Sequence, residues 1–432
     1  MKKLIKRMSL LFAVIFLTAA FGMALSGCDG DTPGEETGLT LPPIKTETTT
    51  TTAKIETTSV PAVTTEAPAT TEPIVTTSPE PVVEDGAYVN PLTGLKTLNY
   101  SPINTRPVAI VIDNIKNAYA NQKGIGQADV LYEALVAPGI TRYLAVVQDY
   151  EKLTTMCNVR SGRDYHIDLA LGHNAILVAH GGSITENYDF FALVAKKLGA
   201  KVSHVLGDID AYKFVNTKDE PMFSWADYTE KYGTIQNRHS RNDLAYDTVV
   251  NGTALKLVIS GSITSLFSKA GGSAAGIPKG FTFASSGTAN MSNALSATNI
   301  DVQFTCSGAS GTKFVEFKYD AASGRYVRYQ DKKYSGAGEI LSFNNVIVLG
   351  TEVKDATGTK EDPHISLVKT TGSGSGYYFT NGKAIKITWN KSSDTAPLKF
   401  YVSGTLTELE LSKGNTYVGF VESSYVTSTF FN

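Results

Sequence analysis

The sequence has few of the residues that build metal centres and disulfide frameworks. Its 432 residues include three cysteines and six histidines, and neither type forms a closely spaced ligand set. We therefore expect no metal and no other cofactor. The motif G-x-S-x-G, which presents the nucleophile of many hydrolases, is also absent. Cys157 and Cys306 are expected to be buried thiols, with a disulfide between them as the alternative.

A marked excess of positive charge is lacking as well. The N-terminal leader carries four positive charges and residues 29–86 carry a net nine negative charges. About three positive charges remain for residues 87–432 of a chain whose total charge is −2. A nearly neutral body of this size has no electrostatic footprint for nucleic acid, which is therefore not an expected partner.

The first residues predict the cellular location. A basic start, MKKLIKR, precedes the apolar run MSLLFAVIFLTAAFGMA, which is the pattern of an export signal. The run ends in Leu25-Ser26-Gly27-Cys28, a tetrapeptide that resembles the lipobox at which bacterial lipoproteins are cleaved and acylated. We predict a lipoprotein signal peptide over residues 1–27 and a lipid anchor on Cys28, which would hold the protein at the extracytoplasmic face of the cell membrane. An ordinary signal peptide or an uncleaved anchor helix is the alternative.

A segment of different composition follows the leader. Residues 28–86 contain the cysteine and then a run rich in threonine, proline and glutamate, without aromatic residues. Such a composition cannot bury enough apolar surface to offset the entropy of ordering. We predict a disordered stalk that acts as a spacer.

The remaining 346 residues are long enough for two domains. In the first, 87–270, PVAIVIDN (107–114) predicts a buried strand, and residues 128–136 and 141–150 predict a hairpin around a Pro-Gly turn. A strand is expected over 175–180, and helices are expected from Ser161, over 188–199 and over 241–258. Short β-branched and aromatic segments separated by turn residues predict a second domain over 280–432. The expected fold class is α+β or α/β, with an N-terminal mixed α/β domain followed by a β-rich antiparallel C-terminal domain.

The stretch VRSGRDYH (159–166) places two arginines at an expected helix start. Ser161 and Asp164 have the spacing of an N-cap and an acid three residues later. Arg160 and Arg163 flank this cap. Together with the backbone N–H groups of the first turn, they would bind an anion such as a phosphate or a carboxylate.

An internal partner is the alternative for these arginines. Glu133 lies among apolar residues of its expected strand, so it would need a cation if it points inward, and Asp113 ends another strand. A buried ion pair would make the arginines structural.

Two further stretches carry candidate residues. NRHSRNDL (237–244) repeats the cap spacing between arginines, and AILVAHGGS (175–183) ends a strand with His180 and two glycines. Because α/β folds bind ligands at the carboxyl ends of strands, His180 is a candidate general base oriented by Asp113 or Glu133, with a hydrogen-bonded structural histidine as the alternative. The candidate ligand-binding residues are Asp113, Glu133, Arg142, Arg160, Arg163, His180, Ser183, Arg238, His239 and Arg241.

These stretches together resemble the YerB-like lipoproteins, a family of Gram-positive bacteria built on a domain of unknown function. The resemblance covers residues 90–425 and is most specific in the first half. It is carried there by NPLTGL, RPVAIVIDN, GQADVLYEALVAPGITRYLAVVQ, VRSGRDYHIDLA, AHGGS and NRHSRNDLAYDT, and later by YDAASGRYVRYQ and GSGSGYYFTNGKAIKITWNK. The resemblance implies an exported lipoprotein of two parts, with no established activity, cofactor or catalytic residue.

Three functions are consistent with these observations. The leading hypothesis is a non-enzymatic surface lipoprotein that binds an anionic envelope component, such as a cell-wall polymer, or an envelope protein. A cell-wall hydrolase or transferase that uses Asp113, Glu133 and His180 is the second. The third is a scaffold for a membrane-associated complex, in which the arginines are structural.

Overall fold

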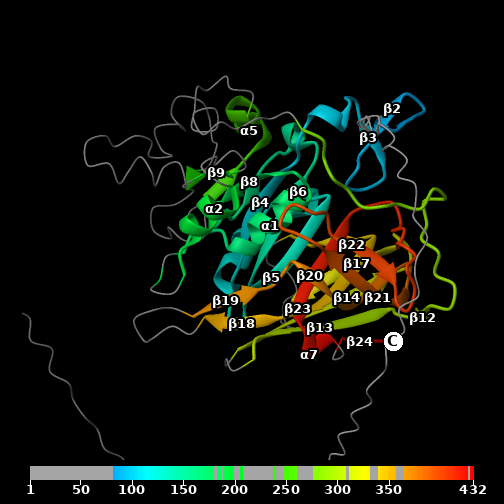
Figure 1. Ribbon diagram of the computed structural model, residues 1–432. Helices are drawn as coiled ribbons and strands as arrows, with labels where there is room; N and C mark the ends of the chain where they lie inside the picture. The colour runs from blue at the N-terminus through cyan, green and yellow to red at the C-terminus, as the bar shows by residue number, and fades with distance from the viewer. Residues whose placement is uncertain are drawn as a thin grey trace, which may run out of the picture. The chain divides into compact units, whose positions relative to one another are not determined.

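The structure of the chain is a computed structural model in which strands predominate (Figure 1). It describes residues 81–179, 182–183, 185, 188–198, 205–207, 237–238, 248–259, 276–307, 311–330, 339–356, 364–426 and 429–432. Cys157 and Cys306 are both buried, and no disulfide joins them. Across these stretches, no helix has the length and apolar character needed to cross a bilayer.

The main sheet draws its strands from both halves of the chain. It has eleven strands within the described residues, and near its middle β23 runs parallel to both β5 and β17. The order is β12 (Leu295–Ser296), β21 (Lys383–Lys391), β20 (Gly372–Thr380), β17 (Asn345–Thr351), β23 (Thr416–Glu422), β5 (Val130–Ala137), β6 (Ile140–Val147), β4 (Val108–Asn114), β8 (Ile176–Ala179) and β9 (Val205–Gly207), and β22 (Lys399–Val402) pairs with β21.

Smaller sheets and short helices complete the fold. A five-stranded sheet runs in the order β16 (Ser342–Phe343), β15 (Arg325–Gln330), β14 (Thr312–Asp320), β13 (Asn299–Thr305) and β24 (Phe430–Phe431). The other strands are β1 (Val83–Glu84), β2 (Ala87–Val89) and β3 (Lys96–Leu98), then β10 (Asn237–Arg238), β11 (Thr248–Val250) and β7 (Met156–Cys157), and the pair β18 (Val353–Ala356) and β19 (Ile365–Val368). The α-helices within the described residues are α1 (Asp164–Gly172), α2 (Phe190–Leu198), α5 (Gly252–Ile259) and α7 (Ser423–Val426). Short 3-10 helices are η1 (Pro102–Asn104), η2 (Lys116–Asn121), η3 (Ile125–Gln127) and η4 (Tyr150–Lys152).

The hairpin predicted from the sequence is confirmed. Strands β5 and β6 pair antiparallel, and the turn between them contains Pro138 and Gly139. Gly139 has a φ of +70°, which the second central position of a type II turn requires. The strand expected over 107–114 is β4, in which all seven residues are buried.

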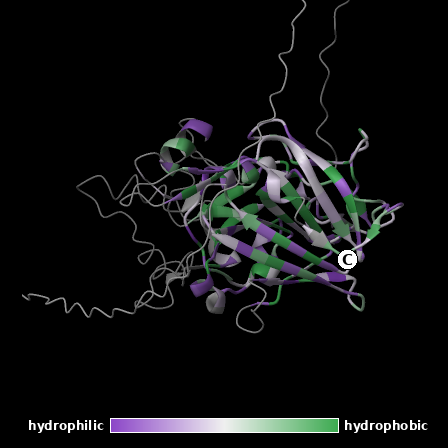
Figure 2. Ribbon diagram, turned by 90° about the horizontal axis from the view of Figure 1, so that it is seen from below, coloured by the Kyte–Doolittle hydropathy of each residue, from purple (hydrophilic) through white to green (hydrophobic). Residues whose placement is uncertain are grey.

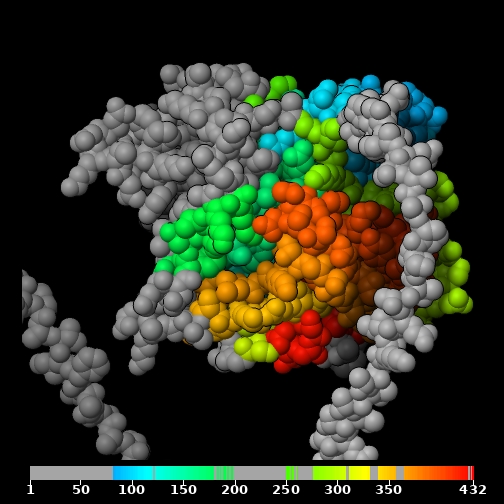
Figure 3. All heavy atoms as spheres, viewed as in Figure 1, coloured from blue at the N-terminus to red at the C-terminus, as the bar shows by residue number. Residues whose placement is uncertain are grey.

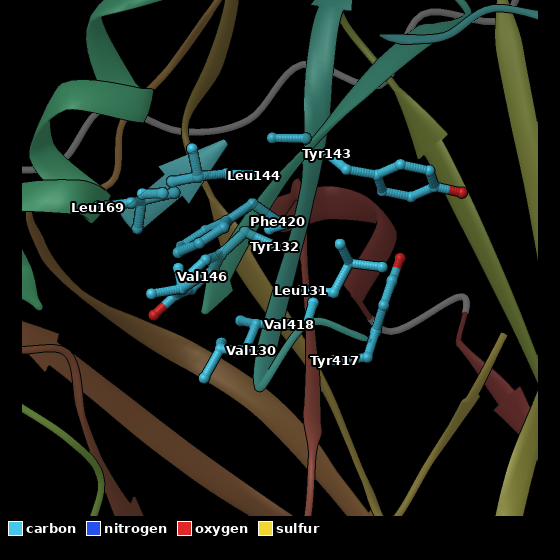
Figure 4. Close-up of a cluster of buried hydrophobic side chains, with 14 of the residues drawn as sticks. Val130, Leu131, Tyr132, Tyr143, Leu144, Val146, Leu169, Tyr417, Val418 and Phe420 are labelled. Carbon is cyan, nitrogen blue, oxygen red and sulfur yellow. The ribbon is translucent and has the colours of Figure 1, made fainter. Parts of the chain in front are cut away.

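Both faces of the main sheet are covered around β5, β6 and β23. On one face Tyr132 packs near Leu169 of α1, and on the other Tyr143 and Tyr417 point away from that helix (Figure 4). Tyr417 meets Phe317 of the five-stranded sheet at 4.8 Å between ring centroids. Because both faces are buried, the central strands are continuous apolar runs, whereas other strands alternate between hydrophobic and hydrophilic residues (Figure 2).

The mixed α/β fold expected for the N-terminal domain is wrong. Its described residues form more strand than helix, and its helices α1, α2 and α5 have nine, nine and eight residues. The C-terminal region, expected to be β-rich and antiparallel, is β-rich and has mostly antiparallel pairs, but its strands β17 and β23 are parallel. The chain has a β-rich fold in which strands of both halves share one sheet. An apolar run looks the same in the sequence whichever strand it pairs with, so this pairing was not predictable.

The helix expected from Ser161 begins three residues later. Residues 158–160 are extended because their backbone hydrogen-bonds along β4, at 2.8 and 2.9 Å. Helix α1 therefore starts at Asp164, with Arg163 at the N-cap position and Nδ1 of His166 accepting its backbone N–H at 2.9 Å. The serine cap predicted from the spacing is wrong.

Two other expectations change in the described residues. Within 241–258, where one helix was expected, residues 248–250 form β11 and only the following residues form α5, because a β-branched Thr-Val-Val run pairs with β7. The last residues of the predicted stalk, 83–84, form β1. The domain boundary between 270 and 280 stays a prediction, and Cys28 lies outside the described residues.

Candidate functional site

Three arginines and one aspartate lie together where β4 ends. Asp113 is opposite Arg142 in the antiparallel register of β4 and β6, and Arg160 belongs to the extended segment that runs along β4. Arg163 caps α1, which packs against β4 and β8 (Figure 1). We call Asp113, Arg142, Arg160, Arg163 and His166 the arginine site.

Asp113 contacts two of the arginines, but loosely. Its two carboxylate oxygens are 3.3 Å from Nε of Arg160 and 3.9 Å from Nε of Arg142. Strong charge-assisted hydrogen bonds are shorter, about 2.7–2.9 Å. Arg142 also donates to the Ser161 carbonyl at 2.6 Å, and Arg163 donates to the carbonyl of the preceding residue at 3.1 Å. The guanidinium groups of Arg142 and Arg163 thus hold the loop before α1, while Asp113 is shared by Arg142 and Arg160.

Burial and mutual repulsion govern the electrostatics of the arginine site. Burial, followed by repulsion from Arg163, lowers the pKa of Arg142 to about 9, so it stays charged at neutral pH. Burial, followed by the charges of Arg142 and Arg163, lowers the pKa of His166 well below its usual range, so its ring is neutral. Asp164, in the first turn of α1, accepts a hydrogen bond from the Tyr188 hydroxyl at 3.2 Å. The charge of the site is positive even when Asp164 is counted.

Four buried nitrogen atoms of the arginine site lack a hydrogen-bond acceptor within the described part of the chain. They are Nε of Arg142, Arg160 and Arg163 and Nε2 of His166. Since Nδ1 of His166 accepts a backbone N–H, the neutral ring carries its proton on Nε2. All four atoms are therefore donors. The group that would satisfy them is an acceptor, which is what an oxyanion supplies.

The loop beside the arginine site is held by close packing of glycines. Gly162 and Gly182 form a parallel backbone bridge, and the ring of Phe190 lies against both of them. A Cβ atom on Gly182 would lie 2.1 Å from that ring. Phe190 also donates its backbone N–H to the carbonyl of Ser183 at 3.0 Å, which places this candidate beside the site. Helix α2 thereby fixes the loop that follows β8 onto the loop that precedes α1.

Several candidate residues fall elsewhere. His180, His239 and Arg241 lie outside the described residues, and Arg238 lies in β10, which pairs with β11. The structure therefore brings Asp113, Arg142, Arg160 and Arg163 close together, and Ser183 is hydrogen-bonded to Phe190, which packs on the adjoining loop. Of the stretch 237–244, the structure describes only Asn237 and Arg238.

Glu133 belongs to a separate, fully buried cluster. One of its carboxylate oxygens accepts from Arg328 at 2.6 Å and from Tyr417 at 2.7 Å. The other accepts from Thr141 at 2.6 Å and Asn114 at 2.9 Å. Although burial would raise the pKa of Glu133, the nearby cations Arg328 and Lys313 lower it below its usual value. Glu133 is a saturated structural carboxylate, paired with the C-terminal half rather than with Arg160 or Arg163.

Strand geometry separates Glu133 from Asp113. In the registers of β4, β6 and β5, Asp113 is opposite Arg142, whereas Glu133 is opposite Tyr143. Arg142 and Tyr143 are consecutive, and consecutive strand residues point to opposite faces of a sheet. Asp113 consequently lies on the α1 face and Glu133 on the face of the five-stranded sheet.

A charged cleft of about 310 Å³ is lined on one side by Asp164 and Asp168 of α1. Helices α1 and α2 form one wall and the β18–β19 pair forms the other, and their surfaces adjoin in Figure 3. Asp168 of α1 pairs with Lys197 of α2, and Glu352 pairs with Lys354. Since the charges of these pairs compensate each other, the cleft differs from the arginine site.

Comparison with known families accounts for both halves of the chain. Residues 92–241 match "Protein of unknown function (DUF3048) N-terminal domain", and residues 300–418 match the C-terminal domain of the same description. The chain is also 43% identical over 93 residues to a protein of Bacillus subtilis (strain 168) named "Putative lipoprotein YerB". The chain belongs to the YerB-like family. The aligned part covers 22% of this chain and 27% of that relative, about a quarter of its length.

A solved structure agrees with the YerB-like fold. The crystal structure of YerB from Bacillus subtilis matches with a TM-score of 0.56 at 21% identity, over 77% of this chain and 96% of that chain. At this level of identity the likeness concerns the fold alone. The YerB-like family assigned from sequence motifs is confirmed.

Some residues of these clusters were not found from the sequence. His166 belongs to the arginine site, Phe190 packs on the loop beside it, and Lys313 and Arg328 neutralise Glu133. For His166 a signal exists, since it follows Arg163 by three residues, the spacing of a capping contact. Arg328 is 195 residues from Glu133, and no local pattern joins them.

Proposed function

We propose that this chain is a lipid-anchored protein of the cell surface whose arginine site binds an anionic group of an envelope polymer. The proposed location is supported by the export signal, the lipobox at Cys28 and the similarity to a protein named "Putative lipoprotein YerB". The observation that carries the proposed binding is the set of buried donors without acceptors in the arginine site.

Asp113 alone does not supply enough negative charge or enough hydrogen-bond acceptors for the buried arginines. A buried cation is expected to be paired, and Asp113 is loosely shared between Arg142 and Arg160. Arg163, which is 5% exposed, has no ion pair with Asp113. A visiting oxyanion would supply the missing acceptor and the missing negative charge together.

The geometry of the site favours a phosphate or carboxylate group. Guanidinium groups bind both through planar, charge-assisted hydrogen bonds, and the positive end of the dipole of α1 lies beside Arg163. The side chain of Arg160 is 30% exposed and that of Arg142 is 11% exposed, so the site opens to solvent on their side. A polymer that presents such groups along its length could reach it.

A hydrolase that used Asp113 and Glu133 together with His180 would need both acids in one site. They occupy opposite faces of the main sheet, and Glu133 already accepts four hydrogen bonds. We therefore propose that the site binds an anionic polymer rather than cleaving it.

Titration calorimetry of the full-length protein tests the proposal. The probes are inorganic phosphate and poly(glycerol phosphate), and the variant is Arg160→Gln with Arg163→Gln. We expect the variant to bind poly(glycerol phosphate) at least about tenfold more weakly, a loss of about 1.4 kcal/mol.

Lys386→Gln is the matched control, because it removes one exposed positive charge from β21, several strands away. It should bind as the wild type does. Absence of binding in the wild type, or equal binding by the double variant with an unchanged melting temperature, would refute the proposal.

A further inference from the structure

A second cavity, besides the charged cleft beside α1, is formed by residues that are distant in the sequence from those of the arginine site. It has a volume of about 430 Å³ and is lined by residues of the three-stranded sheet, by 280–285 and by residues on either side of β22. This volume falls within the range of small-molecule sites, about 300–1,000 Å³.

Backbone contacts preform this cavity. The segments around Phe283 and Leu411 pair as a parallel bridge, with hydrogen bonds of 2.8 and 2.9 Å. Gly280 lies so close to Pro91 that an added Cβ would be 1.6 Å from its carbonyl oxygen. Gly94, at a φ of +68°, lies in the same way against the ring of Phe283. Three segments that are far apart in the sequence are thereby held in one arrangement.

Aromatic rings form much of the apolar lining. Phe281 and Phe283 are half-buried and both line the cavity, and the buried Phe400 lies 5.5 Å from Phe281 between ring centroids. Leu398 and Leu409 extend the apolar surface. Phe281 and Phe283 are packed against the core and remain partly exposed at the cavity, where an aromatic ring can stack on an apolar face of a ligand.

The charged groups of the cavity neutralise one another. Lys399 pairs with Glu408 at 2.7 Å, and Lys413 pairs with Glu84 at 3.7 Å. Glu408 also accepts from the hydroxyl of Thr282 at 2.8 Å. The cavity therefore has no net charge, in contrast with the arginine site, and yet offers hydrogen-bond donors and acceptors beside its aromatic rings.

We infer that this cavity is a binding site for an uncharged oligosaccharide. A pyranose ring has an apolar C–H face, which suits Phe281 and Phe283, and a rim of hydroxyl groups, which suits Glu408 and Lys399. An anionic polymer gains nothing from compensated charges. An acyl chain would leave the four charged groups without a role. Among the described residues beside the cavity, an extended peptide would find the two-residue edge strand β1, whereas the outer edge of β22 is already hydrogen-bonded to residues 407–409.

The test is titration of the full-length protein with triacetylchitotriose, an uncharged trisaccharide, by calorimetry and saturation-transfer NMR. We expect saturable binding with saturation transfer to the ring protons. Phe283→Ala and the isosteric Glu408→Gln should each weaken binding at least about fivefold. Glu408→Gln keeps the side-chain size, so it tests the site even if Phe283→Ala lowers stability.

Two controls separate this site from other surfaces. Phe314→Ala alters a phenylalanine that is 39% exposed on β14, and Arg160→Gln alters the arginine site. Neither should change trisaccharide binding. The inference is overturned if the wild type does not bind the trisaccharide, or if both cavity variants bind it as the wild type does.

Discussion

Glu133 offers a sharp test of how the two halves of the chain hold together. The substitution Glu133→Gln keeps the shape of the side chain and removes its charge. The carboxylate is 0% exposed and pairs with Arg328 at 2.6 Å, with Lys313 at 3.9 Å. In the variant the buried Arg328 loses the carboxylate that it pairs with. Breaking a buried ion pair by removing one partner costs about 3–5 kcal/mol, and we expect a loss of that size in the free energy of unfolding.

Urea unfolding of the full-length protein, followed by tyrosine fluorescence and circular dichroism, measures this loss. Glu316→Gln is the matched control, because Glu316 pairs with Lys318 at 3.4 Å on the adjacent sheet and is 23% exposed. Its cost should stay below about 1 kcal/mol. The double variant Glu133→Gln with Arg328→Met should recover part of the loss, since the stranded cation is removed.

The pH dependence follows from the direction of the pKa shift. The folded-state pKa of Glu133 is below its ordinary value of 4.5 because Arg328 and Lys313 outweigh the effect of burial. The stabilisation is therefore present above pH 4.5 and is lost as the pH falls through the folded-state pKa. The difference between wild type and Glu133→Gln should be constant from pH 6 to 8. A cost below 1 kcal/mol at pH 7 would refute the reasoning.

Three further predictions concern packing and protonation. Gly182→Ala should destabilise the protein by about 1–3 kcal/mol in urea unfolding, because the new Cβ would meet the Phe190 ring; an unchanged midpoint would contradict this. Burial raises the pKa of Asp129 to about 6, so the folded state binds this proton more tightly and gains about 1 kcal/mol between pH 7 and 5. Asp129→Asn should remove that gain, and an identical pH profile would count against it. Burial lowers the pKa of His173 to about 4, so stability should fall by about 3 kcal/mol from pH 6.5 to 4, and His173→Gln should flatten this fall in thermal unfolding at several pH values.

Local patterns predicted the local structure well. The hairpin of β5 and β6, the strand β4 and the strand β8 follow from apolar runs and from the Pro-Gly turn, because these signals depend on neighbours in the sequence. Family motifs in the first half predicted the YerB-like assignment. The position of α1 was missed by three residues, since pairing of 158–160 with β4 outweighed the capping signal.

The sequence by itself determined which charged residues are candidates for the site beside α1. Only the tertiary structure decided which groups those residues contact. Glu133 and Asp113 looked equivalent as acids in apolar strands. Strand alternation and register sent them to opposite faces of the main sheet, where Glu133 meets Arg328 and Asp113 meets Arg142 and Arg160. The contact between Glu133 and Arg328 spans 195 residues, and it forms because strands of both halves of the chain share the main sheet. The physical reason is that periodicity fixes the face of a residue within its strand, whereas the partner on that face is chosen by packing between distant segments.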